Sequence, residues 1–457
     1  MNIPQGYKQT ELGIIPEDWE VKTIGDLGRI VGGGTPSTTI PQYWNGGIAW
    51  YTPAEIGCGK YLNSSLKTIS EFGLHASSAR LLPPGTILLT TRASIGLSAI
   101  LQQTGTTNQG FQSVIVYDSY DNEFVYYLLQ QYIDVMYSLA SGSTFLEISK
   151  KKLALINVAF PVNRIEQRAI AEALSDIDGL IAALDKKIAK KRLIKQGAMQ
   201  QLLTGKKRLP GFTDPWVERE LMAICDVLDN KRIPLNEEQR KTGIYPYCGA
   251  NGIVDFIDQY IFEEDLILIA EDGGNFEQFE TRPISYWMTG KYWVNNHAHV
   301  LKAKSDYNQK YIFYQLEHKD ITDYIVSGTR TKLTRSQLDK IKILLPNSQS
   351  EQQAIATILS DMDKEIADLE AKRDKYRLLK SGMMQKLLTG QIRLTKPLIK
   401  VAPLVPELSA AREIPVDAHI LAGHIVNRLW QSKGWGRTKL QKSLHCIFPL
   451  IIINLSN

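Results

Sequence analysis

The chain has 457 residues, of which 44% are hydrophobic and 22% are charged, and its formal net charge is +5. This length is too great for one ordinary hydrophobic core, and the composition is typical of soluble globular proteins, so we expect two domains with connecting elements. The four cysteines form no CxxC pair, the first residues contain no secretion signal, and the longest apolar run, 447–455, is too short to span a bilayer. A disulfide-rich secreted protein and a membrane protein are excluded, and we expect a cytoplasmic one.

The positive charge is unevenly distributed along the chain. Residues 151–209 contain 13 basic and 5 acidic side chains, whereas residues 7–150 contain 8 and 12, and residues 210–342 contain 16 and 21. A basic segment can bind nucleic acid, but the two stretches that we expect to be globular are acidic overall. Any DNA-binding surface on them must therefore be local.

The first globular stretch opens with PEDWEVKTIGDLGRIVGGGTP at 16–36, and we expect Trp19 to anchor it by core packing. The three glycines at 32–34 predict a turn rather than a cofactor cradle. Residues 85–100 predict strands bordered by turns. Residues 141–161 predict a glycine-containing loop, a short helix and a strand that ends in proline.

A helical segment then occurs twice in the chain. Residues 166–209 and 351–394 align without a gap at an offset of 185 residues and are identical at 26 of 44 positions. Each copy contains LLTG shortly before its end, and the glycine of this motif is typical of a helix C-terminus. Apolar residues recur in both copies at spacings of four and three, which is a heptad seam. The seam residues are Ile170, Leu174, Ile177, Ile181, Leu184 and Ile188 in the first copy, and Ile355, Leu359, Met362, Ile366 and Leu369 in the second.

A helix of roughly 35–40 residues would be about 55 Å long, so each copy needs a partner along its seam. We expect the two copies to pair antiparallel, with the globular stretches at opposite ends. The alternative is that each helix packs back on its own domain.

The repeat extends beyond the helix. The closing segment of the second globular stretch, 326–346, matches 141–161 at the same offset, and Trp216 opens this stretch as Trp19 opens the first. Residues 263–276 predict another strand bordered by turns. Between these opening and closing segments the two stretches differ in sequence, so one shared frame holds two different inserts.

Motifs of catalysis are absent from the sequence. There is no GxxxxGK[ST] phosphate loop and no Asn-Pro-Pro-aromatic motif of base methylation, and the Glu-x-Lys at 370–372 lies on the heptad helix. His297 and His299 stand at strand spacing without a third ligand, so we interpret them as structural and expect no metal site. A binding protein is therefore favoured over an enzyme.

This order of segments resembles the specificity subunit of type I restriction-modification systems over residues 6–394. In the first half the resemblance rests on GYKQTELGIIPEDWE, WYTPAEI, LLPPGTILLTTRASIG and TNQGFQSVI, and on the helix EQRAIA…LLTGKKRL. In the second half it rests on YCGANGIVDFIDQYIFEEDLILIAEDGGN, NNHAHVLK and the second helix.

The resemblance implies an α+β protein with two target-recognition domains, related by a pseudo-two-fold internal repeat and bridged by an antiparallel pair of long coiled-coil helices. The implied boundaries are a first target-recognition domain at 1–150, a first helical spacer at 151–209, a second target-recognition domain at 210–342, a second helical spacer at 343–394, and a linker with a helical extension of unknown role at 395–457.

The resemblance also implies a non-catalytic subunit that reads a split, asymmetric target in double-stranded DNA. Its helices would set the distance between the half-targets and dock two methyltransferase subunits, and ATP-dependent translocase-nuclease (restriction) subunits would complete the enzyme. S-adenosylmethionine, ATP and Mg are then expected in the partner subunits, with no cofactor in this chain and no membrane partner.

Base discrimination requires polar or charged side chains on loops, while phosphate contacts set the register. We select Thr35, Ser37, Thr38, Lys67, Arg92 and Ser94 in the first domain, and Lys231, Arg232, Asn251, Asn275, Arg330 and Lys332 in the second. The alternative is that most of these are ordinary residues of surface loops.

Two other functions fit the same residues. A coiled-coil scaffold would assemble partners and bind protein through its acidic domains, and sequence-selective DNA binding would count against it. A free-standing DNA-binding regulator would act alone, and dependence on a methyltransferase subunit would count against it.

Overall fold

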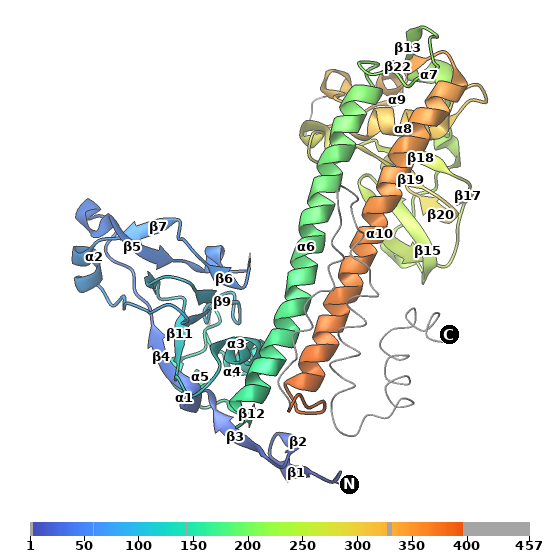
Figure 1. Ribbon diagram of the computed structural model, residues 1–457. Helices are drawn as coiled ribbons and strands as arrows, with labels where there is room; N and C mark the ends of the chain where they lie inside the picture. The colour runs from blue at the N-terminus through green and yellow to red at the C-terminus, as the bar shows by residue number, and fades with distance from the viewer. Residues whose placement is uncertain (1–2, 58, 143, 327–330, 396–457) are drawn as a thin grey trace, which may run out of the picture. The chain divides into compact units, whose positions relative to one another are not determined.

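The computed structural model describes residues 3–57, 59–142, 144–326 and 331–395 (Figure 1). The candidate residue Arg330 lies outside this part of the chain, as do two of the four cysteines, Cys58 and Cys446, and the extension at 396–457, which includes the apolar run.

The chain divides into two compact units. The first unit comprises residues 1–183 and 374–457, and the second unit comprises residues 184–373. Two long helices, α6 (Arg164–Leu202) and α10 (Gln349–Leu387), each contribute residues to both units. Both have 39 residues, which confirms the length expected from the repeat. Among the described helices, none is both long and apolar enough to cross a bilayer.

Two sheets form the globular part of the first unit. The five-stranded sheet has the order β4 (Gly28–Gly32), β11 (Gln112–Val116), β8 (Ile87–Leu89), β9 (Ser98–Leu101) and β6 (Tyr61–Leu62). The three-stranded sheet has the order β10 (Gly105–Thr107), β5 (Trp44–Tyr51) and β7 (Lys67–Ile69). β8 and β9 are buried along their whole length, which confirms the strands expected within 85–100.

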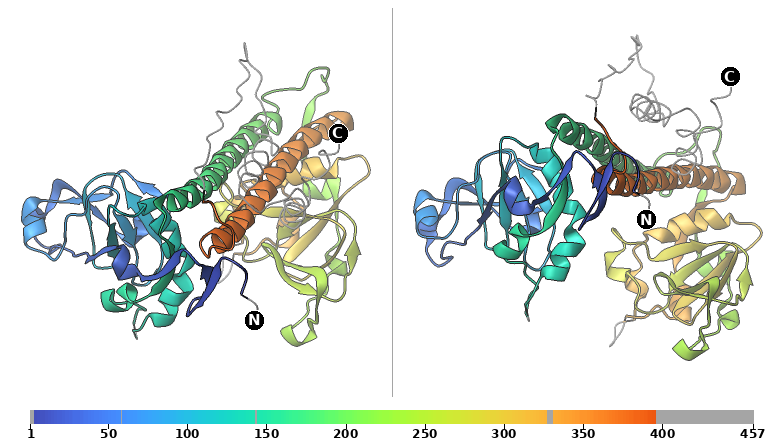
Figure 2. Two further views of the ribbon diagram at one scale, coloured as in Figure 1. Left: turned by 60° about the horizontal axis from the view of Figure 1, so that its bottom comes forward. Right: turned by 90° about the horizontal axis from the view of Figure 1, so that it is seen from below.

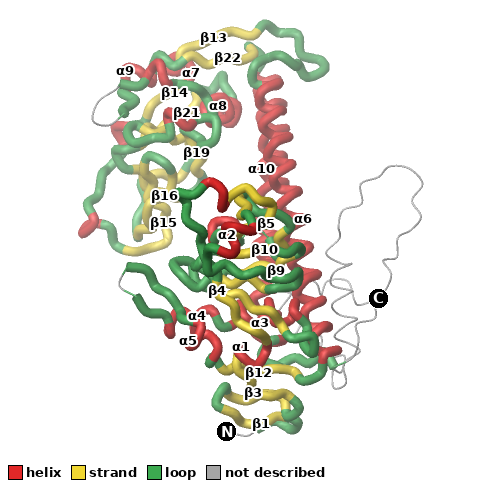
Figure 3. Tube along the Cα trace, turned by 90° about the vertical axis from the view of Figure 1, so that its left-hand side faces the viewer, coloured by secondary structure: helices red, strands yellow, loops and turns green. Residues whose placement is uncertain are grey.

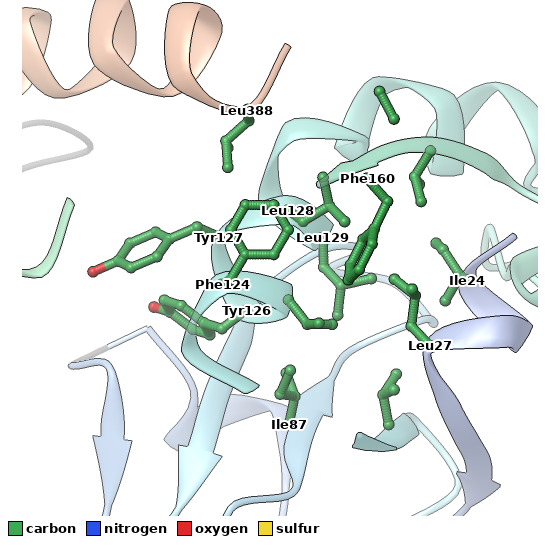
Figure 4. Close-up of a cluster of buried hydrophobic side chains, with 14 of the residues drawn as sticks. Ile24, Leu27, Ile87, Phe124, Tyr126, Tyr127, Leu128, Leu129, Phe160 and Leu388 are labelled. Atoms are coloured by element: carbon green, nitrogen blue, oxygen red, sulfur yellow. The ribbon is translucent and has the colours of Figure 1, made fainter. Parts of the chain in front are cut away.

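Neighbouring residues of β8 point to opposite faces of the five-stranded sheet, as a strand requires. Leu88 packs with Tyr51 and Phe111 between the two sheets. Ile87 packs on the other face against α3 (Asn122–Gln131), where it joins Phe124 (Figure 4). The sheet is therefore covered on both sides.

Short elements complete the first unit. They are β1 (Tyr7–Thr10), β2 (Gly13–Pro16), β3 (Trp19–Thr23), α1 (Ile24–Leu27), η1 (Pro41–Tyr43), η2 (Pro53–Glu55), α2 (Glu71–His75), α4 (Ile133–Leu139), α5 (Lys150–Ala154) and β12 (Asn157–Pro161).

The second unit is also built on two sheets, seen from two further sides in Figure 2. One has the order β14 (Cys225–Val227), β21 (Ala298–Ala303), β18 (Leu266–Ala270) and β19 (Ser285–Met288), and the other has the order β16 (Gly252–Ile257), β15 (Thr242–Gly249), β20 (Lys291–Val294) and β17 (Phe262–Glu263). Helix α8 (Gln309–Glu317) packs on the first of these sheets (Figure 3). β18 is wholly buried, which confirms the strand expected within 263–276.

The remaining elements of the second unit are short. They are β13 (Trp216–Glu220), α7 (Leu221–Ile224), η3 (Asp229–Lys231), η4 (Glu237–Gln239), η5 (Phe276–Gln278), η6 (Thr322–Tyr324), α9 (Arg335–Leu338) and β22 (Lys342–Pro346).

The shared frame expected from the sequence is present in both units. In the first, the opening strand β3 pairs antiparallel with β12, with Trp19 opposite Pro161. In the second, β13 pairs in the same way with β22, with Trp216 opposite Pro346. A short helix precedes the closing strand in each case, as expected.

Within each unit, segments of the two long helices run antiparallel. In the first unit Asp178 of α6 pairs with Lys380 of α10 at 2.7 Å, and Glu166 pairs with Arg393, which follows α10. In the second unit Lys195 of α6 pairs with Asp363 of α10, also at 2.7 Å. Glycines follow both helices in the left-handed conformation, Gly205 with φ +69° and Gly390 with φ +70°, which confirms the expected helix ends.

The beginning of each seam packs on its own globular part. Ile170 and Leu174 belong to the core of the first unit, and Ile355 and Leu359 belong to the core of the second. The alternative that each helix packs back on its domain therefore holds for these turns. Of the other seam residues, Ile177, Ile188 and Ile366 are buried, whereas Ile181, Leu184, Met362 and Leu369 are half-buried.

The glycine triplet at 32–34 is not a turn, contrary to the sequence-based expectation. Gly32 ends β4, and none of the three has a positive φ. A Cβ on Gly33 would lie 2.1 Å from the carbonyl oxygen of Asn108, and one on Gly34 would lie 2.2 Å from the hydroxyl of Ser78. Glycine is required here because other chain segments approach the backbone closely.

Candidate nucleic-acid interface

In the first unit, residues 107–110, here called the TNQG segment, bring two groups of predicted site residues together. Thr35 donates its hydroxyl hydrogen to Oε1 of Gln109 at 2.5 Å, just after Gly34 donates its backbone N–H to the carbonyl oxygen of Thr107 at 2.8 Å. On the other side, Thr91 donates its backbone N–H to the carbonyl oxygen of Gly110 at 2.9 Å. The loops that hold Thr35 and Arg92 therefore share one support.

Near the glycine triplet, three polar side-chain atoms lack hydrogen-bond partners within the described part of the chain. They are Oγ1 of Thr107, Oε1 of Gln112 and Oγ of Ser113, all buried. A buried polar atom without a partner costs free energy, so such a group is expected to serve a ligand or a local rearrangement. Sequence reasoning missed these residues, although the motif TNQGFQS contains them all.

The turn that follows β8 presents Arg92 from a strained backbone. Ala93 has φ +63°, a conformation that non-glycine residues rarely adopt. The Arg92 guanidinium lies 5.7 Å from the Phe145 ring, and its Nε lies 3.8 Å from Oε2 of Glu147. Arg92 is half-exposed and partly neutralised. The Ser94 carbonyl oxygen accepts a hydrogen bond from the Thr90 hydroxyl within the same turn.

The other predicted residues of the first unit lie on exposed segments. Ser37 shares a hydrogen bond of 2.8 Å with the hydroxyl of Thr39, and Thr38 lies between them. The ammonium group of Lys67 lies 6.0 Å from the Trp44 ring. Thr35, Ser37, Thr38, Lys67, Arg92 and Ser94 stay predictions as DNA contacts.

In the second unit, a buried ionic network joins several loops. Arg232 contacts Oδ2 of Asp229 at 3.3 Å and Oε2 of Glu271 at 2.7 Å, and Lys332 contacts Oε1 of Glu271 at 3.0 Å. His299 completes the network through Asp229 at 2.6 Å. Arg232 is only 12% exposed and also donates to the carbonyl oxygen of Ala298, so its donors are used inside the protein.

Charge explains the ionisation of both carboxyl groups. Burial by itself raises the pKa of Asp229, but the hydrogen bond and charge of His299 hold it below the ordinary value. Burial likewise opposes the ionisation of Glu271, and the hydrogen bonds from Arg232 and Lys332 lower its pKa. Both groups are carboxylates at neutral pH.

The remaining predicted residues of the second unit surround this network. The Asn251 amide donates to the carbonyl oxygen of Gly273 at 2.9 Å, and the Asn275 amide donates to that of Pro283 at 3.2 Å. Lys231 and Lys332 are exposed. Lys231, Arg232, Asn251, Asn275 and Lys332 stay predictions, and Arg330 lies outside the described residues.

The histidines have partners that the sequence did not reveal. His297 contacts Asp272 at 2.8 Å, and His299 stands with Asp229 and Glu271 in a group whose ligand atoms lie within 4.8 Å of one another. The sequence showed no further possible metal ligand near the two histidines, whereas in the structure two carboxylates lie beside His299. A metal ion would have to displace Arg232, which already contacts both carboxylates, so the group is better suited to a guanidinium than to a cation from solution.

Comparison with known proteins identifies the family. The family model described as the type I restriction modification DNA specificity domain matches this chain twice, over residues 16–191 and 213–376. The type I restriction enzyme MjaIX specificity subunit of Methanocaldococcus jannaschii is 26% identical over 425 residues, which cover 85% of this chain and 96% of that protein. The EcoprrI specificity subunit of Escherichia coli is 24% identical over 349 residues, which cover 72% and 84%.

The fold is shared with solved structures. The S subunit of a type I restriction-modification system from M. genitalium aligns with a TM-score of 0.58 and 18% sequence identity, over 85% of this chain and 98% of that chain. At this identity the likeness shows the fold alone. The two matches of the family model, one for each half of the internal repeat, cover most of the sequence. The chain therefore belongs to the family of type I restriction-modification DNA specificity proteins.

Proposed function

We propose that this chain is the DNA-sequence-specificity subunit of a type I restriction-modification complex, and that its two globular parts are target-recognition domains that read the two halves of a split, asymmetric DNA target. The single observation that supports this most is the repeat of one frame around two different inserts. Trp19 and Trp216 open the two domains, while β12 and β22 close them. Two domains with the same opening and closing strands but different inserts are suited to recognise two different DNA sequences.

In this proposal the long helices bridge the domains and set the spacing of the half-targets. Each has 39 residues, and each unit contains an antiparallel contact between them. Successive turns of DNA are about 34 Å apart, so a rigid spacer of fixed length would fix the number of base pairs between the two half-targets. The segment boundaries at 150, 209, 342 and 394 are those proposed above.

The helices also offer equivalent surfaces for a partner. Leu193 on α6 is 68% exposed, and Leu378, at the same place in the second copy of the repeat, is 76% exposed. Single exposed leucines are common on protein surfaces, but the recurrence of this one at equivalent positions of the repeat supports a contact with a partner that binds each copy. We propose that each site docks one methyltransferase subunit, which gives two per chain, and that the restriction subunits join that assembly.

The chain itself is proposed to be non-catalytic. S-adenosylmethionine, ATP and Mg would be bound by the partner subunits, and the DNA target places the complex in the cytoplasm. In the described residues, the polar groups gathered at the loops are hydrogen-bond donors, acceptors and cations, which suit base and phosphate contacts.

Genome-wide mapping of methylated bases tests the proposal. The chain is expressed with its neighbouring methyltransferase subunit in a host without DNA methylation. One split motif with a fixed gap is expected, and it should disappear when this chain is omitted. A folded complex that adds no methylation would favour the scaffold, and selective DNA binding without any need for the methyltransferase would favour the regulator.

A further inference from the structure

His299 in the second unit is buried with both ring nitrogens facing hydrogen-bond acceptors. Its side chain is 1% exposed, Nδ1 lies 2.6 Å from Oδ2 of Asp229, and Nε2 lies 2.8 Å from the carbonyl oxygen of Leu333. The other oxygen of Asp229 receives the backbone N–H of Val300 at 3.0 Å, so the carboxyl group is held from two sides. Both ring nitrogens of His299 are therefore used in contacts with segments outside its own strand.

The partners of His299 belong to loops and not to the sheet that holds it. His299 lies on β21, where its backbone pairs with Ile269 of β18. Asp229 begins η3, which ends at Lys231 and is followed by Arg232, and Leu333 directly follows Lys332. One side chain thus joins two segments that are about a hundred residues apart and that both contain exposed lysines.

The same network extends to a third loop. Glu271, just after β18, contacts Arg232 and Lys332 and lies 3.8 Å from Nδ1 of His299. Its carbonyl oxygen accepts the backbone N–H of Leu333 at 2.8 Å. Beside it, Asp272 contacts His297, which is 42% exposed. The partly buried carboxylates of Asp229 and Glu271 thus lie against Arg232, Lys332 and the His299 ring.

The corresponding place in the first unit is built differently. There, Arg92 and Glu147 form the isolated bridge that Asp272 and Lys332 form in the second unit. The signs of the charges are exchanged between the two bridges. Glu147 and Lys332 occupy equivalent positions of the repeat, at the offset of 185 residues. The first unit supports this bridge with the contact between Arg92 and Phe145, where the second has the histidine network.

We propose that His299 is a positioning residue for sequence reading by the second globular part, where it holds residues 229–232 and 331–333 in the arrangement that one half-target requires. The inference rests on the proposed role of this part as a target-recognition domain. His299 does not touch DNA. It acts through the loops whose exposed Lys231 and Lys332 flank it, so its loss should change the reading of one half-target and leave the other unchanged.

The test compares the two half-targets in one molecule. The full chain is assembled with its methyltransferase subunit, and methylation rates are measured on the cognate target and on targets with one base pair changed in either half. The variants are His299→Asn, whose amide can replace only the donor to Asp229, and His299→Gln, whose amide can replace only the donor to Leu333. His297→Asn is the matched control, because this neighbouring histidine is half-exposed and contacts Asp272 alone.

Both His299 variants should lose about tenfold discrimination at the half-target read by the second unit, roughly the contribution of one base contact. Discrimination at the other half-target and the His297→Asn control should not change. Unchanged discrimination at both halves, or an equal loss at both, would overturn the proposal, since an equal loss indicates unfolding or failed assembly. If the unaltered complex produces no split motif, the specificity function itself fails and the positioning role falls with it.

Discussion

Glu166 and Arg393 are 227 residues apart in the sequence and form a two-pronged ion pair, with Nε to Oε1 at 2.6 Å and Nη2 to Oε2 at 2.8 Å. The same contact recurs in the second unit between Glu351 and Arg208, at 2.8 and 2.7 Å. Both glutamates lie in the first turn of a long helix and are almost fully buried, and both arginines follow the other long helix. Each unit is thereby held to segments of both helices.

Replacing Arg393 by alanine should strongly destabilise the first unit. Within the described residues, the change leaves the buried Glu166 carboxylate with the Trp19 indole as its side-chain partner, which donates to it at 3.1 Å. Removing one partner of a buried ion pair costs about 3–5 kcal/mol. The midpoint of urea unfolding should fall accordingly. Arg168→Ala, which removes an exposed pair with Glu172, is the control and should cost about 0.5 kcal/mol. Equal effects of the two changes would contradict the importance of the buried pair.

Replacing Arg92 by alanine should weaken DNA binding by the assembled complex by about 1–3 kcal/mol. The guanidinium is half-exposed on a strained turn and is partly neutralised by Glu147. Glu147→Gln removes this neighbouring negative charge, so it should strengthen binding and increase its dependence on salt. Titration at several salt concentrations measures both effects. Unchanged binding by a folded Arg92→Ala complex would remove this residue from the interface.

Replacing Leu193 or Leu378 by alanine should remove partner subunits one at a time. Each leucine is exposed in the chain itself, so the change should leave its unfolding midpoint within about 0.5 kcal/mol. Native mass spectrometry with the methyltransferase subunit in moderate excess should show two bound copies for the unaltered chain and one for either variant. Leu155→Ala, another exposed leucine, is the control. Two bound copies on the double variant would place the docking surface elsewhere.

The stability of the second unit should fall in acid through Asp229 and Glu271. The pKa of each carboxyl lies below its ordinary value. Their contribution is therefore complete above the ordinary carboxyl pKa of about 4 and is lost as the pH falls through the lower folded pKa. Hydrogen exchange of second-unit peptides should show less protection below pH 4. Asp229→Asn should reduce this pH dependence, and an unaltered profile would assign the acid sensitivity to other groups.

The periodic and repeated elements were predictable from the amino-acid sequence. The heptad spacing and terminal glycines predicted both long helices, and the paired tryptophans and prolines predicted the frame, because these signals depend on residues close together in the chain. The repeat also indicated that Glu166 and Glu351 are equivalent. The family resemblance came from the same ordered motifs and agrees with the family model that matches both halves.

Residues that are distant in the sequence and share a site can be recognised only in the folded chain. The glycines at 32–34 by themselves predict a turn. The sequence does not reveal that Asn108 and Ser78 approach their backbone, which is the actual reason for glycine here. His299 had no visible partner for the same reason, since Asp229 lies 70 residues before it and Leu333 lies 34 residues after it. Contacts of this kind depend on how sheets and loops pack, and a local pattern cannot specify them. The candidate sites in the inserts are therefore recognisable only in the folded chain, whereas the frame around the inserts was predictable from its repeated local pattern.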